Sequence, residues 1–254
     1  MHTVMPECDT RPNASALLGA RTADAVASGA PLGRIGNLEV RLARNEAEIA
    51  AAQEVRYRVF YDELGARKDL FQAQDRRDAG GFYSEGEFEL TKLVARHPGQ
   101  RFLELGRSCV LPEYRSKRTI EALWQGIWAY INHYGIGVMT GCASFHGIVP
   151  AAHAEALTYL AHHCRTNQAW DVKAVAGRYC SMDLMPIEAV NAKAAIAAMP
   201  PLVKGYLRVG ARIGDGCVID HEFSTVDVFV VMPVKEIGAR YVNYYGGEGQ
   251  RFAA

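Results

Sequence analysis

Hydrophobic and polar residues recur along the chain with two different periods, and these predict strands and helices in succession. Residues 38–42 (LEVRL) alternate with the two-residue period of a strand that buries one face. Residues 46–64 instead carry apolar side chains at helical intervals, and Gly65 supplies a helix stop. The inward face of this predicted helix consists of Ile49, Ala52, Val55, Val59 and Phe60.

The middle of the chain predicts a short turn and helix, then a strand, then a longer helix. The turn and short helix lie within residues 82–97, and the strand runs over residues 102–111, where Pro112 ends it. Thr119 is the expected N-cap of the longer helix. The apolar residues of that helix fall on one face: Ile120, Leu123, Trp124, Ile127, Trp128, Ile131 and Tyr134.

The C-terminal half predicts two buried strands and two helices. Residues 138–144 and 225–234 have the apolar and small content of buried strands, and Asp227 lies inside the second. Residues 150–164 are rich in alanine and predict a helix, and Pro200 opens a shorter one. A basic stripe at helical spacing follows, formed by Lys204, Arg208 and Arg212. Strands that alternate with helices indicate an α/β fold, or an α+β fold with a mixed sheet.

Two segments lack such a pattern. Residues 1–36 are rich in Ala, Gly, Ser and Thr without sustained periodicity, which is typical of a flexible leader. Residues 66–81 carry many charges and little apolar content. We expect this second segment to be an exposed connection.

The stretch from the predicted strand to the long helix concentrates the polar groups that suggest chemistry. In a regular strand Glu104 and Ser108 would lie on one face, with Arg107 and Cys109 on the other. A basic loop then precedes the helix, whose N-terminus offers unpaired N–H groups and a positive dipole end. Such a place binds phosphate, although a surface turn that is basic by chance has the same pattern. The basic residues are Arg115, Lys117 and Arg118.

Composition narrows the range of functions. The formal net charge is zero, so the whole chain is not a polycation that binds nucleic acid. No run of about eighteen apolar residues occurs, so no membrane span is expected. The six cysteines are scattered without a CxxC pair, which is typical of reduced thiols in a cytosolic protein. No residues have the spacing of a metal site, because the adjacent side chains of residues 162–164 (HHC) cannot converge on one ion.

Several motifs together resemble the ornithine-lipid N-acyltransferase family. They are residues 56–61 (RYRVFY) with Gly65, 104–109 (ELGRSC) with Pro112, 114–118 (YRSKR), 141–145 (GCASF), 201–208 (PLVKGYLR) and 214–216 (GDG). The family is similar to acyl-homoserine-lactone synthases, so the resemblance implies the GNAT acyltransferase fold, with a mixed central sheet flanked by helices. It implies one domain over residues 37–246, followed by a tail at residues 247–254.

The resemblance also implies that this chain is shortened. Family members carry an acid-rich stretch and two more antiparallel strands between the RVFY helix and the GFYS segment. In this chain Gly65 and Gly80 are separated only by ARKDLFQAQDRRDA. The sheet is therefore expected to lack strands of the N-terminal lobe, which exposes one of its edges.

The reaction implied by the resemblance is transfer of a 3-hydroxyacyl group from acyl carrier protein to the α-amine of ornithine, giving lyso-ornithine lipid. Acyl carrier protein is then a co-substrate, and no cofactor is required. The catalytic candidates are Glu104, Arg107 and Ser108, and the chemistry of the amine makes the Glu104 carboxylate, acting directly or through water, the candidate base for its surplus proton. The resemblance places at Gly106 the strand bulge whose N–H stabilises the oxyanion.

The binding residues have alternative interpretations that the sequence leaves open. The candidates for binding acyl carrier protein and its phosphopantetheine are Tyr114, Arg115, Lys117 and Arg118. The candidates for binding the substrate are Arg58, Phe60 and Asp227. Phe60 equally fits a core position, and Asp227 equally fits a hydrogen-bonded structural acid. Glu104 and Arg107 equally fit a buried structural ion pair. Cys109 is expected to be a small core residue rather than a nucleophile.

Three functions remain as hypotheses: the ornithine N-acyltransferase, an acyltransferase that uses another amino acid or makes a lactone-type signal, and a GNAT-like module that binds acyl carrier or lipid without turnover. The expected location is the cytoplasm, with peripheral contact to anionic membrane as an open possibility. The Lys204, Arg208 and Arg212 stripe would then dock acidic carrier protein or lipid headgroups, unless it is an ordinary solvated face.

Overall fold

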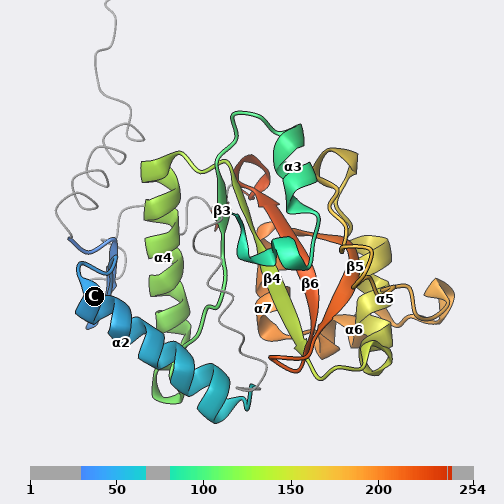
Figure 1. Ribbon diagram of the computed structural model, residues 1–254, viewed down its shortest axis with the longest axis horizontal. Coiled ribbons are helices and arrows are strands. Elements are labelled where there is room, and N and C mark those ends of the chain that lie inside the picture. Colours follow the sequence, from blue (N-terminus) through green and yellow to red (C-terminus); the bar gives the residue numbers. More distant parts are fainter. Residues whose placement is uncertain (1–29, 67–80, 239, 242–254) are drawn as a thin grey trace, which may run out of the picture.

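The computed structural model describes residues 30–66, 81–238, 240 and 241 (Figure 1). Its centre is a four-stranded sheet with the order β3-β4-β6-β5. Strand β3 (Phe102–Glu104) runs parallel to β4 (Val138–His146), and β4 is antiparallel to β6 (Thr225–Pro233). Strand β5 (Arg212–Asp220) closes the order antiparallel to β6. The mixed sheet confirms the predicted α+β fold.

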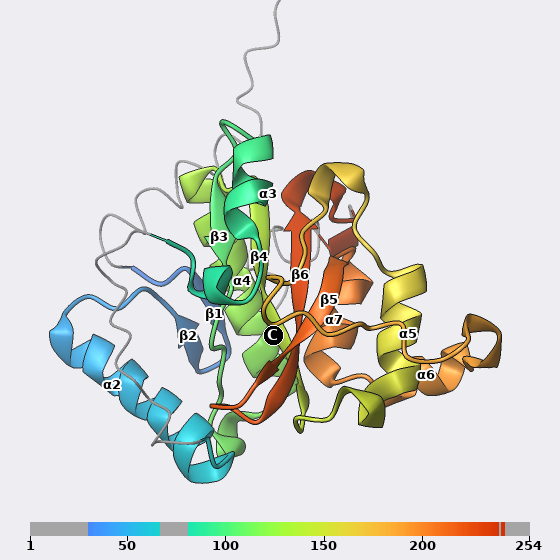
Figure 2. The same ribbon diagram turned by 45° about the vertical axis from the view of Figure 1, so that its right-hand side comes forward.

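One face of the sheet is covered by the longest helix and by three C-terminal helices. Helix α4 (Lys117–Tyr134) packs there beside α7 (Pro201–Val209), and α5 (Ala154–His163) and α6 (Ala192–Ala198) gather beside β5 (Figure 2). The core on this face unites side chains of β4 and β6 with those of α4, α5 and α7. Alternate residues of β4 and β6 point into it, as the two-residue period of strands requires.

The opposite face has a smaller core, and it is the face that carries the polar groups described below. Helix α3 (Leu90–Arg96) and the preceding 3-10 turn η4 (Tyr83–Gly86) lie over it. Phe88 is fully buried there and packs on Phe229 with ring centroids 5.0 Å apart. Residues 82–97 therefore form a turn and a helix, as the sequence predicts.

The N-terminal elements lie on the far side of α4 from the C-terminal helices. Strands β1 (Gly33–Ile35) and β2 (Leu38–Val40) form a hairpin that contacts α4, and α2 (Glu46–Tyr57) follows it (Figure 1). Ile35 is buried, so residues 33–36 belong to the folded domain and not to a flexible leader. The rest of the predicted leader, residues 1–29, and the tail at 247–254 lie outside the described residues.

The helix predicted over residues 46–64 is interrupted. An α-helix ends at Tyr57 and a π-helix, η1 (Arg58–Glu63), continues it. None of the residues of α2 is buried, and Ile49 is 41% exposed, so the expected inward face holds only near Val59, which is buried in η1. Gly65 does stop the helix, with a left-handed φ of 69°. The predicted connection that follows lies mostly outside the described residues.

Three other predictions from the pattern are wrong. The strand expected over residues 102–111 ends at Glu104, because the backbone of Arg107 turns into the left-handed region (φ 53°). The N-cap of α4 is Ser116, whose side chain accepts from the N–H of Thr119, so the helix begins three residues early. Arg212 lies in β5 and therefore does not extend the stripe of α7.

The sequence pattern also missed β5 and α6. Strand β5 contains Gly214 and Gly216, and its register against β6 shifts between Ile213 and Cys217. Glycines and a bulge remove the alternation by which a strand is recognised. At Gly216 the φ of 78° and the ring of Tyr179 against the backbone leave no room for a side chain. The other two strands of the core, β4 and β6, are confirmed where they were predicted.

Candidate active site

The site begins where β3 leaves β4. The last contact between the two strands is a hydrogen bond from the Leu105 N–H to the Thr140 carbonyl (2.7 Å). At the next residue of β4, a Cβ atom on Gly141 would lie 2.2 Å from the Leu105 carbonyl oxygen. Glycine is thus required for β3 to approach β4 this closely before it turns away at Arg107.

Glu104, the last residue of β3, holds the turn η4 over the sheet. Its carboxylate accepts hydrogen bonds from the N–H of Tyr83 (2.7 Å) and the N–H of Ser84 (2.9 Å). It also accepts one from the Ser84 hydroxyl (2.5 Å). Three donors on one carboxylate tie a surface turn to a core strand, and this fixes the direction in which the chain continues to Glu87.

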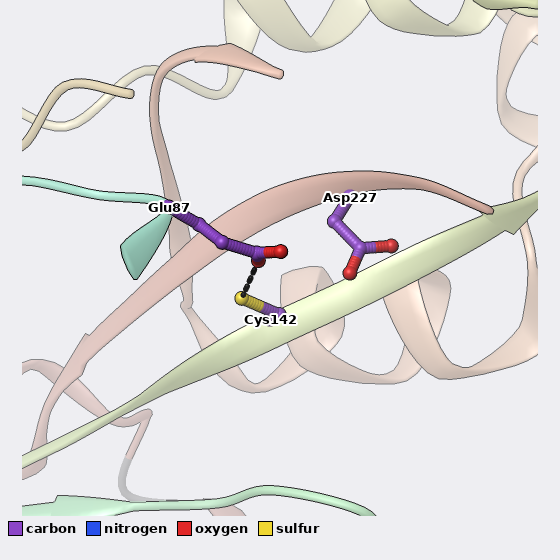
Figure 3. A group of neighbouring side chains, drawn as sticks. All are labelled: Glu87, Cys142 and Asp227. Carbon is purple, nitrogen blue, oxygen red and sulfur yellow. Dashed lines mark hydrogen bonds between the residues drawn. The ribbon is translucent and has the colours of Figure 1, made fainter. Parts of the chain in front are cut away.

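Beyond that turn, three titratable side chains from three elements come together. Glu87 follows η4, Cys142 lies on β4 and Asp227 lies on β6 (Figure 3). One carboxylate oxygen of each acid and the Cys142 Sγ all lie within 4.8 Å of one another. The Cys142 thiol contacts the Ser84 hydroxyl (3.2 Å) and donates to Glu87 Oε2 (3.4 Å). A continuous chain of contacts therefore joins Glu104, through Ser84 and Cys142, to Glu87.

This cluster is buried, and its charges are poorly compensated. Burial, and then the negative charge of Asp227, raises the pKa of Glu87 to about 7. Burial also raises the pKa of Asp227, and it raises that of the Cys142 thiol well above its ordinary value. The guanidinium of Arg178 lies 3.1 Å from Glu87 Oε1 and opposes this effect. Two carboxyl groups and a neutral thiol thus face one another beside a single arginine.

The surroundings of the cluster add further negative charge. Desolvation and the charges of Glu222, Asp220 and Glu87 raise the pKa of Tyr83. The guanidinium of Arg107 lies over the Tyr83 ring, 4.1 Å from its centroid. The site is therefore acidic inside and has the guanidinium groups of Arg178 and Arg107 at its edge, an arrangement complementary to a molecule that carries ammonium groups.

Comparison with known proteins identifies the family. Residues 69–125 match the acetyltransferase (GNAT) domain. The chain is 51% identical to L-ornithine N(alpha)-acyltransferase of Brucella abortus (strain 2308), over 87% of this chain and 93% of that protein. The chain belongs to the L-ornithine N(alpha)-acyltransferase family. Identity is 49% with the protein of that name from Agrobacterium fabrum (86% of this chain, 88% of that protein) and 48% with that of Rhizobium meliloti (92% and 93%). This chain is thus an acyltransferase with a GNAT domain.

This member of the L-ornithine N(alpha)-acyltransferase family is shorter than its relatives. The Brucella comparison extends over 261 aligned positions, whereas 87% of the 254 residues of this chain is only about 221. Roughly forty positions of the relative hence have no counterpart here. The difference agrees with the expected shortening, while its place between Gly65 and Gly80 stays a prediction. No solved structure matches the chain.

Within the family site, the three catalytic candidates have different surroundings. Glu104 is bonded to the η4 turn as described, and the ion pairs of the described residues do not include one between it and Arg107. The Arg107 guanidinium packs instead on Tyr83 and Phe223, and its Nε is buried without a hydrogen-bond partner among the described residues. Ser108 is exposed in the irregular segment that follows. Their catalytic roles stay predictions.

The basic candidates of this acyltransferase divide into two groups. Arg115 is committed to Glu63, to which both terminal nitrogens donate at 2.6 Å, and its Nε donates to the Val110 carbonyl. It therefore fastens the loop to the π-helix. Lys117 is 88% exposed, 3.4 Å from Glu121, and Arg118 is also exposed in the first turn of α4. Tyr114 is 53% exposed.

The substrate-binding candidates of the enzyme are also separated. Asp227 is in the buried cluster, whereas Arg58 is exposed on η1. Phe60 is half-buried and meets Phe223 edge to face, with centroids 5.6 Å apart. Sequence reasoning did not select Ser84, Glu87 or Cys142. The sequence signal that pointed to Glu87 is its position directly before the aromatic residue Phe88. Because Phe88 is fully buried, the neighbouring Glu87 is buried as well.

The burial of Glu87 predicts a pH-dependent stability. Its carboxyl group loses a proton near pH 4.5 in the unfolded chain but near pH 7 in the folded enzyme, so the free energy of unfolding falls as pH rises through this window. We expect Glu87→Gln to stabilise the enzyme by about 2 kcal/mol at pH 8 and by much less at pH 4.5. Urea unfolding at both pH values measures this.

The comparison isolates Glu87 because its charged neighbours Asp227, Asp220 and Arg178 are common to both proteins. Identical stability curves for the variant and the wild type would mean that Glu87 is well solvated.

Within the part of the chain that is described, no helix combines the length and apolarity needed to cross a membrane.

Proposed function

We propose that the enzyme transfers a 3-hydroxyacyl group from acyl carrier protein to the α-amine of L-ornithine and so makes lyso-ornithine lipid. The names of the relatives, which cover most of this chain, support ornithine as the acceptor. The observation that carries the proposal is the acidic cluster of Glu87, Cys142 and Asp227, which lies near the point where β3 separates from β4. Buried carboxylates favour an acceptor with positively charged amines, such as a diamine.

The chemistry follows from the amine. An α-amine has a pKa of about 7.7 to 8.0, so only a minority of it is the free nucleophile at neutral pH. We assign Glu104 as the base that removes the surplus proton. The amine nitrogen then attacks the thioester carbonyl, and the backbone N–H near Gly106 stabilises the oxyanion. The C–N bond forms and the C–S bond breaks. The carrier thiolate takes up the second proton, which the nitrogen loses when it becomes an amide, and the first proton passes from Glu104 to solvent.

The exposed cations at the start of α4 are the proposed contact for acyl carrier protein. Lys117 and Arg118 flank the helix N-terminus, where N–H groups and the helix dipole favour a phosphate. Arg115 then holds the loop in place through Glu63. The same cations suit peripheral contact with anionic membrane in the cytoplasm, which we propose as a secondary role.

Activity is tested by incubating the purified protein with 3-hydroxyacyl carrier protein and ornithine and measuring the product by mass spectrometry. We expect an acyclic N-acyl-ornithine with a free δ-amine. A cyclised product would mean lactone-type or lactam chemistry, and product with another amino acid in place of ornithine would correct the acceptor.

One observation favours a second function, a module that binds acyl carrier protein without turnover. The chain lacks roughly forty positions that its relatives have. A folded protein that binds the acylated carrier but gives no product with any amino acid would establish that function instead.

The carrier contact predicts a charge effect. Replacing both Lys117 and Arg118 by glutamine is expected to raise KM for the acyl carrier about tenfold with little change in kcat, because long-range attraction is lost. The dependence of kcat/KM on salt should weaken in parallel. The matched control is Lys193→Gln, which removes an exposed cation from α6. Equal salt dependence in all three proteins would contradict the assignment.

A further inference from the structure

We propose that Glu87 and Asp227 form the specificity subsite for the side-chain δ-ammonium of the acceptor, so that a diamino acid is held by its δ-end while its α-amine meets the thioester. The inference rests on the proposed function and names the residues that recognise its substrate. It accounts for acylation of one of two chemically similar amines.

The first support is a buried acid of which one oxygen has no hydrogen-bond partner. Asp227 is only 6% exposed, and its Oδ1 has no hydrogen-bond partner among the described residues. Its carboxyl group lies near the Cys142 thiol and the Glu87 carboxyl group (Figure 3). A buried polar atom without a partner costs free energy, and a ligand that donates a hydrogen bond removes that cost.

The charges of the cluster match a single ammonium group. With both carboxyl groups ionised, Glu87, Asp227 and Arg178 carry one net negative charge, and burial keeps the Cys142 thiol neutral. An ammonium group supplies one positive charge and three N–H donors, which the two carboxylates can accept. Binding would therefore neutralise the net charge of these three side chains.

The cluster lies at the border between core and solvent. Along the same face of β4, Thr140 is buried, Cys142 is partly buried, and Ser144 and His146 are exposed. Ser144 pairs in register with Asp227. The Asp227 end of the cluster is therefore the end nearer to solvent.

The separation of the proposed base from the subsite suits a diamine of ornithine length. Contacts of 2.5, 3.2 and 3.4 Å lead from Glu104 Oε1 through Ser84 and Cys142 to Glu87 Oε2, so these oxygens are no more than about 9 Å apart. The two nitrogens of extended ornithine are about 6 Å apart, from standard bond lengths. Ornithine lying alongside this chain of contacts brings one nitrogen to each end.

The same three side chains could also hold a metal ion. A divalent metal would require the Cys142 thiolate, and Arg178 already brings a positive charge to within 3.1 Å of Glu87 Oε1. Both features favour a singly charged organic cation. The experiment below separates the two ligands.

The test compares ornithine with norvaline, which has the same carbon chain and no δ-amine. We expect the wild type to prefer ornithine by on the order of 100-fold in kcat/KM. Asp227→Asn should abolish most of that preference by raising KM for ornithine, whereas kcat/KM for norvaline should fall much less. Asparagine resembles the protonated acid in shape, so the variant is expected to fold. The control is Asp183→Asn, which removes an exposed carboxylate paired with His162.

Several outcomes would overturn the subsite. The first is an equal fall in kcat/KM for ornithine and norvaline in Asp227→Asn. The second is equal kcat/KM for the two substrates in the wild type, and the third is acylation of the δ-amine. A stoichiometric zinc ion that is lost in Cys142→Ser together with ornithine binding would overturn it as well. If the wild type makes no product, the proposed function fails, and calorimetric titration with ornithine and norvaline still tests the subsite, since ornithine should bind much more tightly than norvaline.

Discussion

Replacing Gly141 by alanine is expected to destabilise the enzyme by about 3 kcal/mol and to reduce acyl transfer roughly 100-fold. The new Cβ would lie 2.2 Å from the carbonyl oxygen and 3.1 Å from the carbonyl carbon of Leu105. Because both are backbone atoms, no side-chain rotation can relieve the contact. Strand β3 would have to move away from β4, and Glu104 would move with it.

The matched control for this change is Gly205→Ala, in helix α7 on the other face of the sheet. Nothing lies within 4 Å of a Cβ at Gly205, and alanine suits a helix interior. We therefore expect stability in urea no lower than that of the wild type and near wild-type turnover. A stable and active Gly141→Ala protein would show that the two strands separate without effect on the site.

Glu104→Gln is expected to have the largest effect on turnover, a fall in kcat/KM of roughly 100-fold to 10,000-fold. The amide has neither the charge nor the basicity to take the amine proton. It also presents an NH2 group toward the donors of Tyr83 and Ser84, so a loss of about 2 kcal/mol in the free energy of unfolding should accompany the kinetic effect.

Ser84→Ala separates the two roles of Glu104. That variant loses only the hydroxyl contact and retains the carboxylate and both backbone donors. If Glu104 acts as the base, Ser84→Ala should keep most of the activity and the wild-type pH profile. Equal losses in Glu104→Gln and Ser84→Ala would mean that Glu104 only positions the η4 turn. Full activity of Glu104→Gln at every pH would remove it as the base.

The parts of the fold that sequence predicted are those with strong local periodicity. Strands β4 and β6 and helix α4 are apolar enough to be identified without knowledge of their neighbours. The strand predicted at β3 was too long, because the residues after Glu104 are equally compatible with a strand. Its end depends on Gly141, which lies on another strand, and on the turn at Arg107.

The candidate site could be predicted only in part for a similar reason. Asp227 was selected because an acid inside an apolar strand is conspicuous. Glu87 and Cys142 looked unremarkable alone, and their significance arises when β4, β6 and the η4 turn bring them together. Arg115 had the right charge for a phosphate, but its bidentate pairing with Glu63 depends on the tertiary position of η1.

The π-helix η1 also constrains how this chain can change during evolution. A π-turn accommodates an extra residue within an α-helix, and here it lets Val59 and Tyr61 both be buried, with the Tyr61 hydroxyl bonded to Glu222 (3.0 Å). Deleting one residue between Arg58 and Glu63 would return this segment to α-helical geometry and leave α2 in place, but it would move Val59 or Tyr61 from its buried position. Single-residue deletions should hence be tolerated poorly here, in a family member that has done without some forty positions of its relatives.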